Sequence, residues 1–127
     1  MQDNQKASCQ QNFSGLSAEK NIVREIVQKF YDKMLSNPKI APFFTNTDMD
    51  QQREMFCAML CIGLEGADRY PADKLRHAHK GLELDDEIFD LTLMTFRNVL
   101  EEQNIPDPLR ANLLRALNKT REDILNR

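Results

Sequence analysis

The segment IVREIVQKFYDKM, residues Ile22–Met34, carries the pattern that decides the fold. Its large apolar side chains recur at one-turn spacing, and Lys and Glu residues occupy positions between them. This spacing is typical of an amphipathic helix that buries one face. Asn37 and Pro38 end the pattern, because the residue before a proline avoids the helical conformation. The segment therefore predicts a long helix packed against a core.

The rest of the chain repeats this helical spacing. Capping residues and apolar stripes predict further helices at about 48–62, 73–79, 85–103 and 107–124. A compact turn rich in proline is expected between the first two helices. Gly81 is expected to close the short helix at 73–79. No segment shows the alternation of a strand. We predict an all-α fold with a polar tail over 1–17 and one domain over 18–127.

Composition excludes several classes of protein. The chain has 127 residues, 17 Lys+Arg against 20 Asp+Glu and a net charge of −3, which argues against binding nucleic acid through a basic face. Its apolar runs are far shorter than the roughly 20 residues of a membrane span. The polar start lacks a secretory signal, and three cysteines suit reduced thiols. We therefore expect a cytoplasmic protein.

The chain has only two histidines, His77 and His79. They lie about 200° apart around a helix, so they cannot both face one site there. An inward histidine beside Leu75 and Leu82 is a candidate metal or cofactor ligand. From spacing alone, an ordinary core or surface histidine is the simpler interpretation.

Cys57 and Cys61 share one helix face, because they lie four residues apart. Together with the two histidines they suggest a zinc-bound interaction module as one hypothesis. Their spacing differs from that of the usual zinc knuckles, which use turns. Buried reduced thiols that act as small apolar side chains are the simpler interpretation.

A set of short motifs follows in a recognisable order and spacing: Phe30-Tyr31, Phe43-Phe44, Asp48-Met49, Gly66-Ala67-Asp68-Arg69-Tyr70, Ala78-His79-Lys80 and Phe89-Asp90. With these motifs the chain resembles a truncated haemoglobin of the group I type over about 22–125. The resemblance implies a two-over-two helical sandwich around haem b.

On the proximal side, the resemblance makes His79 the iron ligand. A neutral imidazole binds iron well, and its second nitrogen needs a backbone acceptor that fixes the tautomer. His77 should then point away from the haem. Leu75, Arg76 and Tyr70 are implied as haem contacts.

On the distal side, the resemblance implies that Phe44 stacks on the haem with Phe43 beside it. Tyr31 and Gln52 become hydrogen-bond donors to a bound gas, because a buried hydroxyl stabilises the negative charge that O₂ draws from ferrous iron. The alternatives are a core tyrosine bonded to backbone and a solvent-facing glutamine. Propionate partners are expected among three cations: Arg53, Lys74 and Arg76.

The chain departs from the family pattern at Met55 and Phe56, where polar residues are common. Met55 covers the haem edge in the simpler interpretation, but a thioether can also ligate iron. Phe56 removes one hydrogen-bond donor. Some members attach haem covalently through a late histidine, and Thr120 occupies that region here, so we predict non-covalent haem.

The resemblance implies a monomeric haem globin that binds O₂, NO and CO. Removal of NO by dioxygenation, with an external reductase, is one expected activity. The alternative is an electron-transfer or redox-sensing protein whose iron is closed by Met55 or another distal side chain. No nucleic-acid or membrane partner is expected.

Overall fold

In the computed structural model the chain is described over residues 17–64 and 72–126, and this part is helical throughout, without strands. Its helices are α2 (Ser17–Ser36), the 3₁₀ helix η1 (Ala41–Phe44), α3 (Met49–Leu64), α4 (Ala72–His79), α5 (Asp86–Glu102), α6 (Leu109–Asn118) and α7 (Arg121–Ile124). The all-α prediction is confirmed. The predicted tail lies outside the described residues, apart from Ser17, where α2 begins.

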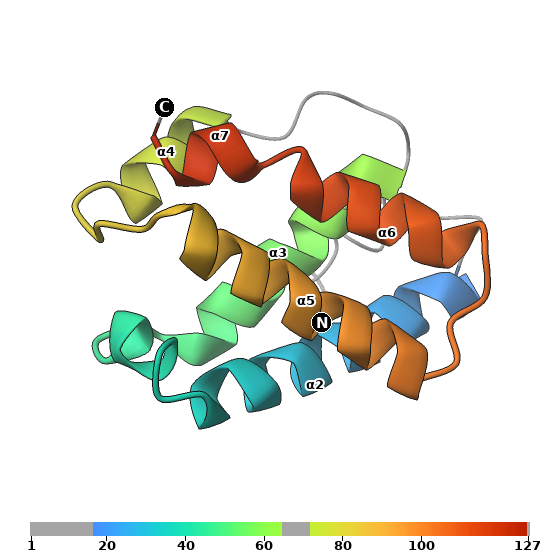
Figure 1. Ribbon diagram of the computed structural model, residues 1–127. Helices are drawn as coiled ribbons and strands as arrows, with labels where there is room; N and C mark the ends of the chain where they lie inside the picture. Colours follow the sequence, from blue (N-terminus) through green and yellow to red (C-terminus); the bar gives the residue numbers. More distant parts are fainter. Residues whose placement is uncertain (1–16, 65–71, 127) are drawn as a thin grey trace, which may run out of the picture.

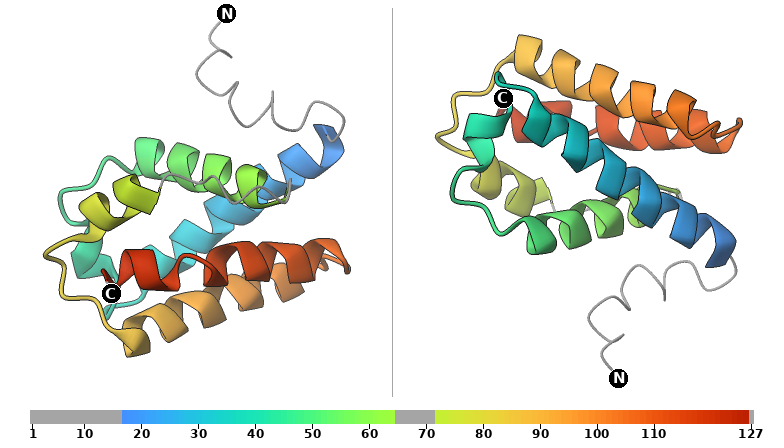
Figure 2. Two further views of the ribbon diagram at one scale, coloured as in Figure 1. Left: turned by 90° about the horizontal axis from the view of Figure 1, so that it is seen from above. Right: turned by 90° about the horizontal axis from the view of Figure 1, so that it is seen from below.

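Two pairs of long helices form the body of the molecule. Helices α2 and α3 pack together, as do α5 and α6, and the pairs meet where α2 contacts α5 and α3 contacts α6. Figures 1 and 2 show the chain reversing direction between α5 and α6 so that these two helices lie side by side. Short α4 packs on α7 at one end of the body.

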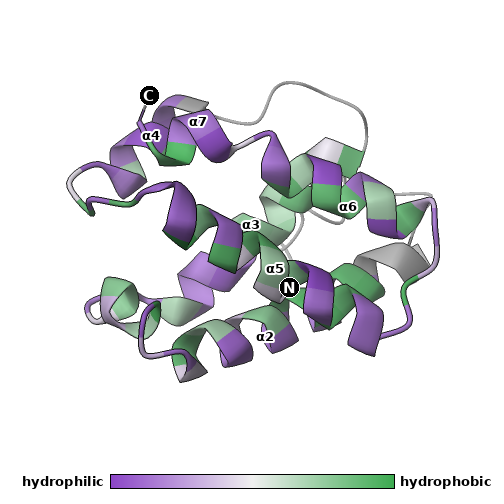
Figure 3. Ribbon diagram, viewed as in Figure 1, coloured by the Kyte–Doolittle hydropathy of each residue, from purple (hydrophilic) through white to green (hydrophobic). Residues whose placement is uncertain are grey.

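The core lies between the two pairs, where the apolar stripes of the long helices meet (Figure 3). Its fully buried members include Ile26, Leu60, Phe96 and Leu113, one from each long helix. Each such side chain contributes about 1.5–3 kcal/mol by leaving water, so mutual burial explains why amphipathic helices of modest length persist. Within 17–64 and 72–126, no helix is long and apolar enough to cross a membrane.

The predicted helix ends are confirmed at three positions. Asp48 accepts a hydrogen bond from the backbone N–H of Gln51 at 3.2 Å, at the start of α3. Asp85 accepts from the backbone N–H of Ile88 at 2.9 Å and caps α5. Gly81, with φ of +84°, follows α4 in the left-handed conformation that glycine adopts readily.

The prediction of one continuous last helix over 107–124 is wrong, because the chain leaves the helix after Asn118 and resumes at Arg121. The buried hydroxyl of Thr120 donates to the carbonyl oxygen of Leu117 at 2.6 Å. Such side-chain bonds to nearby backbone compete with helix continuation. After this break the chain continues as α7, which packs on α4.

Helices α3 and α6 approach closely at Gly63. A Cβ atom added to Gly63 would lie 2.6 Å from the Cβ of Ala116, which is closer than two carbons normally approach. Absence of a side chain at Gly63 therefore sets the distance between the two helix pairs at this crossing.

We expect Gly63→Ala to lower the free energy of unfolding by about 1–3 kcal/mol, because overpacking forces the helices apart. In an open helix the same change would raise it by about 1 kcal/mol. Moving the methyl group across the contact, in Gly63→Ala with Ala116→Gly, should restore stability close to that of the wild type. Chemical denaturation of the three proteins measures this, and a fully stable single variant would contradict a tight crossing.

Candidate functional site

A cavity of about 350 Å³ lies between α4 and the helices α2, η1, α3 and α5, with the C-terminal segment closing one side. Most of its lining is apolar, as is usual for sites that hold a largely buried cofactor. The structure brings together here these predicted site residues: Tyr31, Phe43, Phe44, Gln52, Met55, Phe56, Leu75 and His79.

His79 ends α4 with its imidazole partly buried against this cavity. Its Nδ1 lies 2.7 Å from the carbonyl oxygen of Leu75, one helical turn earlier. Because a carbonyl oxygen can only accept, Nδ1 carries the proton and Nε2 keeps its lone pair. Burial lowers the pKa of His79, and the bond to Leu75 opposes this in part. The side chain is therefore a neutral imidazole with a lone pair on Nε2, the form that binds iron.

Tyr31 and Gln52 form the polar pair of the cavity. The Nε2 of Gln52 donates to the hydroxyl oxygen of Tyr31 at 3.0 Å. Since the tyrosine oxygen is the acceptor in this bond, its own proton stays available for another acceptor. Burial raises the pKa of Tyr31 to about 12, against smaller opposing effects of Gln52 and Arg53. Tyr31 is therefore a neutral hydrogen-bond donor at physiological pH.

Aromatic rings surround this pair. Phe44 meets the Tyr31 ring edge to face at 5.8 Å between centroids, and Phe56 meets it at 5.9 Å. Phe56 also contacts Phe30 at 5.1 Å and Phe96 at 5.7 Å. Such edge contacts restrict ring motion and hold Tyr31 in one orientation.

Met55 and Lys74 line the cavity and also reach solvent. Met55 is 46% exposed, and Lys74 is exposed while it lines the cavity from α4. Lys74 is thus the cation, among the three expected to pair with propionates, that borders the cavity.

The two predicted arginines lie elsewhere. Arg53 pairs with Asp50 at 3.2 Å, and Arg76 pairs with Asp123 at 3.0 Å. Neither arginine lines the cavity. Tyr70, also predicted as a haem contact, lies outside the described residues.

His77 is exposed and does not line the cavity, which confirms that it points away from the site. The described part of the chain contains no group of three or more His, Cys, Asp or Glu side chains placed to hold a metal. His77, His79, Cys57 and Cys61 therefore do not form the zinc site considered above.

The two described cysteines differ from each other. Cys57 carries a buried thiol, and burial raises its pKa. Cys61 is disulfide-bonded, so the expectation of reduced thiols throughout is wrong for this residue. That correction also removes one of the two supports for a cytoplasmic location.

Sequence reasoning missed the contribution of the C-terminal segment, because Ile124 and Leu125 line the cavity together with Ile88 and Thr92 of α5. Ile124 carried an apolar signal, but as part of a continuous helix along α6. In the structure it belongs to α7, which packs on α4.

The residues present fit a haem. The cavity is apolar, one neutral histidine offers an Nε2 lone pair, two phenylalanines flank the space and a lysine borders it. A haem needs this combination of flat apolar contact, one strong axial nitrogen donor and a cation for its carboxylates. Fold and site together define a small helical haem protein.

Comparison with known proteins agrees with this class. The family model described as bacterial-like globin matches residues 13–126. Group 1 truncated hemoglobin of Tetrahymena pyriformis is 30% identical over 107 residues, which cover 84% of this chain and 88% of that protein. Group 1 truncated hemoglobin GlbN of Synechocystis is 32% identical over 106 residues, with coverage of 79% and 86%.

Solved structures are similar as well. The truncated hemoglobin of T. pyriformis in its Fe(III) form superposes with a TM-score of 0.71 at 30% identity, covering 83% of this chain and 90% of that one. The 2/2 hemoglobin of Synechococcus, in a cyanomet state with covalently attached haem, gives 0.75 at 30% identity, with coverage of 85% and 93%. This chain belongs to the bacterial-like globin family, with the two-over-two fold of truncated hemoglobins and haem as its cofactor.

The raised pKa of Tyr31 has a consequence for alkaline stability. Its pKa is about 12 in the folded protein and about 10 when unfolded, so folding keeps the proton bound. This contribution to stability, roughly 2–3 kcal/mol in all, is complete below pH 10 and is lost as the pH rises from 10 to 12. We expect Tyr31→Phe to lose less stability than the wild type over that interval.

Denaturant unfolding at several pH values measures the effect, and Tyr70→Phe, which changes the other tyrosine of the chain, is the control. Equal pH dependence in wild type and Tyr31→Phe would show that the hydroxyl is solvated.

Proposed function

We propose that this protein is a haem-b globin that binds O₂ and other diatomic gases at an iron held by His79. The observation that carries the proposal is the bond from His79 Nδ1 to the Leu75 carbonyl, in the same cavity as the Tyr31–Gln52 pair. The haem, when bound, supplies the iron at which the gas binds.

On the proximal side, His79 is suited to hold the haem through Nε2. The Leu75 carbonyl fixes the imidazole tautomer and raises the electron density of the ring. Phe43, Phe44 and Leu75 provide apolar contact within the cavity, and Lys74 can pair with a haem carboxylate.

On the distal side, Tyr31 donates a hydrogen bond to the bound gas, and Gln52 orients the tyrosine hydroxyl. Gln52 directs its own N–H toward the tyrosine oxygen, which leaves the Tyr31 proton for the gas. A donor fixed in an apolar cavity stabilises partial negative charge without reorganising. Phe56 brings no second donor, so stabilisation depends mainly on one hydroxyl.

Finer parts of the function belong to the same proposal. NO and CO are suitable ligands, since small apolar gases enter an apolar cavity, and removal of NO by dioxygenation would need an external reductase. Haem is held non-covalently, supported by exposed His77 and by Thr120, whose hydroxyl is bonded to Leu117. A monomeric state and a cytoplasmic location are part of the same proposal.

We expect purified protein mixed with haem to give the intense Soret band of a histidine-ligated haem, and His79→Ala to lose that ligation. Visible absorption titration measures both, with His77→Ala as the matched control because His77 is exposed on the same helix. A variant without His79 that keeps the wild-type spectrum would overturn the proximal assignment.

A second candidate function follows from Met55, which lines the cavity from the distal helix α3. Iron closed by its thioether would suit electron transfer or redox sensing rather than gas binding. The same absorption experiment separates the two functions. A six-coordinate low-spin spectrum that Met55→Ala converts to five-coordinate would favour the second.

We expect Tyr31→Phe to release O₂ roughly 10- to 100-fold faster, because one hydrogen bond to a partly charged acceptor is lost. Gln52→Leu should have a smaller effect, since Gln52 acts through the tyrosine. Stopped-flow measurement of the O₂ dissociation rate tests both variants. Unchanged release from Tyr31→Phe would mean that the hydroxyl does not reach the gas.

A further inference from the structure

Helix α4 carries the iron ligand but is only eight residues long. A helix of that length is unstable by itself, so tertiary contacts have to hold it. Its main packing partner is α7, which lies beside it in Figure 1. The position of His79 therefore depends on what fixes α7 and on what joins the two helices.

Polar contacts join α4 to α7 and to the residues that follow α7. Nη1 of Arg76 lies 3.0 Å from the carboxylate of Asp123, and this aspartate side chain is 19% exposed. Asn126 Nδ2 donates to the backbone carbonyl oxygen of Arg76 at 3.1 Å. Both contacts act on Arg76, which directly follows Leu75, the acceptor for the His79 ring.

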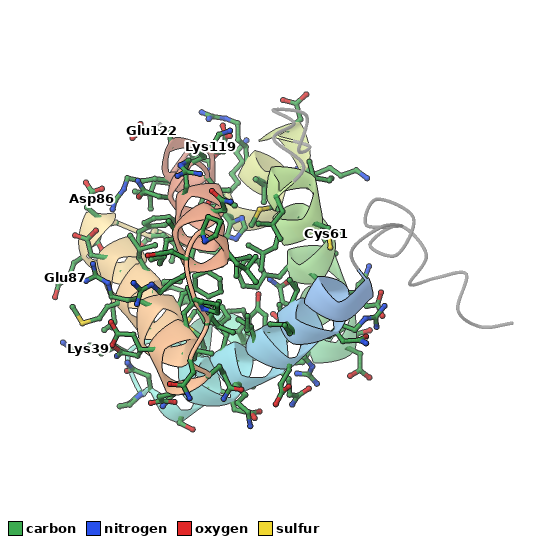
Figure 4. All side chains as sticks on the ribbon, turned by 90° about the vertical axis from the view of Figure 1, so that its right-hand side faces the viewer. Lys39, Cys61, Asp86, Glu87, Lys119 and Glu122 are labelled. Carbon is green, nitrogen blue, oxygen red and sulfur yellow. The ribbon has the colours of Figure 1, made fainter. Side chains whose placement is uncertain are left out.

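Helix α7 is fixed in turn to the start of α5 by Arg121. The guanidinium reaches Asp86 with Nη1 at 2.8 Å and Asp90 with Nη2 at 2.6 Å. It also lies over the Phe89 ring, 4.5 Å from its centroid. Figure 4 shows Asp86 at the beginning of α5, near the C-terminal segment that carries Glu122.

We propose that Asp123 and Arg121 are positioning residues that set the orientation of the His79 imidazole through α4. The path runs from α5 through the Arg121 fork to α7, and from Asp123 to Arg76 beside the Leu75 carbonyl. This inference rests on the proposed function, because it takes His79 as the iron ligand. Arg76 thereby acts in holding α4.

Partly exposed ion pairs such as these add little to global stability. Their effect should appear instead where they are attached, in the alignment of α4 and in how often it separates from α7. If these residues only stabilised the fold, replacing them would lower the unfolding free energy and leave the iron–histidine bond unchanged.

The experiment uses haem-loaded Asp123→Asn, Arg76→Gln and their double variant. Glu102→Gln is the control, because Glu102 forms an ion pair with Lys33 that joins α2 and α5 rather than α4 and α7. Resonance Raman of the ferrous, ligand-free protein reports the iron–histidine stretching frequency. Transfer of haem to an excess of acceptor protein gives the haem dissociation rate.

We expect Asp123→Asn to shift or broaden the iron–histidine band and to speed haem loss roughly three- to tenfold. Arg121→Lys, which breaks the two-pronged contact, should act in the same direction. The double variant should match the single variants, because the two residues share one interaction. Glu102→Gln should match the wild type.

An unchanged band and haem loss in Asp123→Asn would overturn the inference. Faster haem loss in Arg76→Gln alone would also overturn it and would assign Arg76 to a haem carboxylate. If Asp123→Asn fails to fold, Asp123→Glu tests the same contact with its charge kept. A shifted Raman band in that variant would support the inference, and an unchanged band would overturn it. Wild-type protein that binds no haem would instead refute the proposed function.

Discussion

The hydrogen bond from His79 Nδ1 to the Leu75 carbonyl is the interaction on which the site depends. It decides which nitrogen carries the proton, and so leaves Nε2 as the donor atom on a partly buried side chain. The bond spans one helical turn, so it exists only while α4 is helical. Any contact that preserves α4 also preserves the chemistry of its last residue.

The opposite side of the cavity follows a different principle, since its polar groups are one buried pair, Tyr31 and Gln52, among aromatic rings. Phe56, where the family resemblance led us to expect a polar group, joins an aromatic cluster with Phe30 and Phe96. Packing then does part of what hydrogen bonds do elsewhere, because the rings hold Tyr31 in place. Gln52 directs the hydroxyl proton of Tyr31 by donating to the tyrosine oxygen.

Local patterns in the sequence predicted the helices well. The stripe from Ile22 to Met34 and the caps at Asp48 and Asp85 act within a few residues of chain, so they can be found without coordinates. The resemblance located the cavity residues, including His79 and Tyr31, since their order along the chain is characteristic.

Long-range contacts could not be found in the same way. The sequence offered Arg76 as a candidate partner of a haem carboxylate, whereas its partner Asp123 lies 47 residues later. The two acids that hold Arg121 lie 31 and 35 residues before it. The interruption of the helix at Thr120 likewise depends on the competition between one side-chain bond and helix continuation.

Placement of α7 at 121–124 also bears on how the protein matures. Synthesis proceeds from the N-terminus, and all the other described helices leave the ribosome before Arg121 and Asp123. Until then α4 lacks the helix on which it packs, so His79, the proposed iron ligand, is the last part of the site to be organised. Capture of haem by the newly made chain should accordingly be a late event, after the two long helix pairs have assembled.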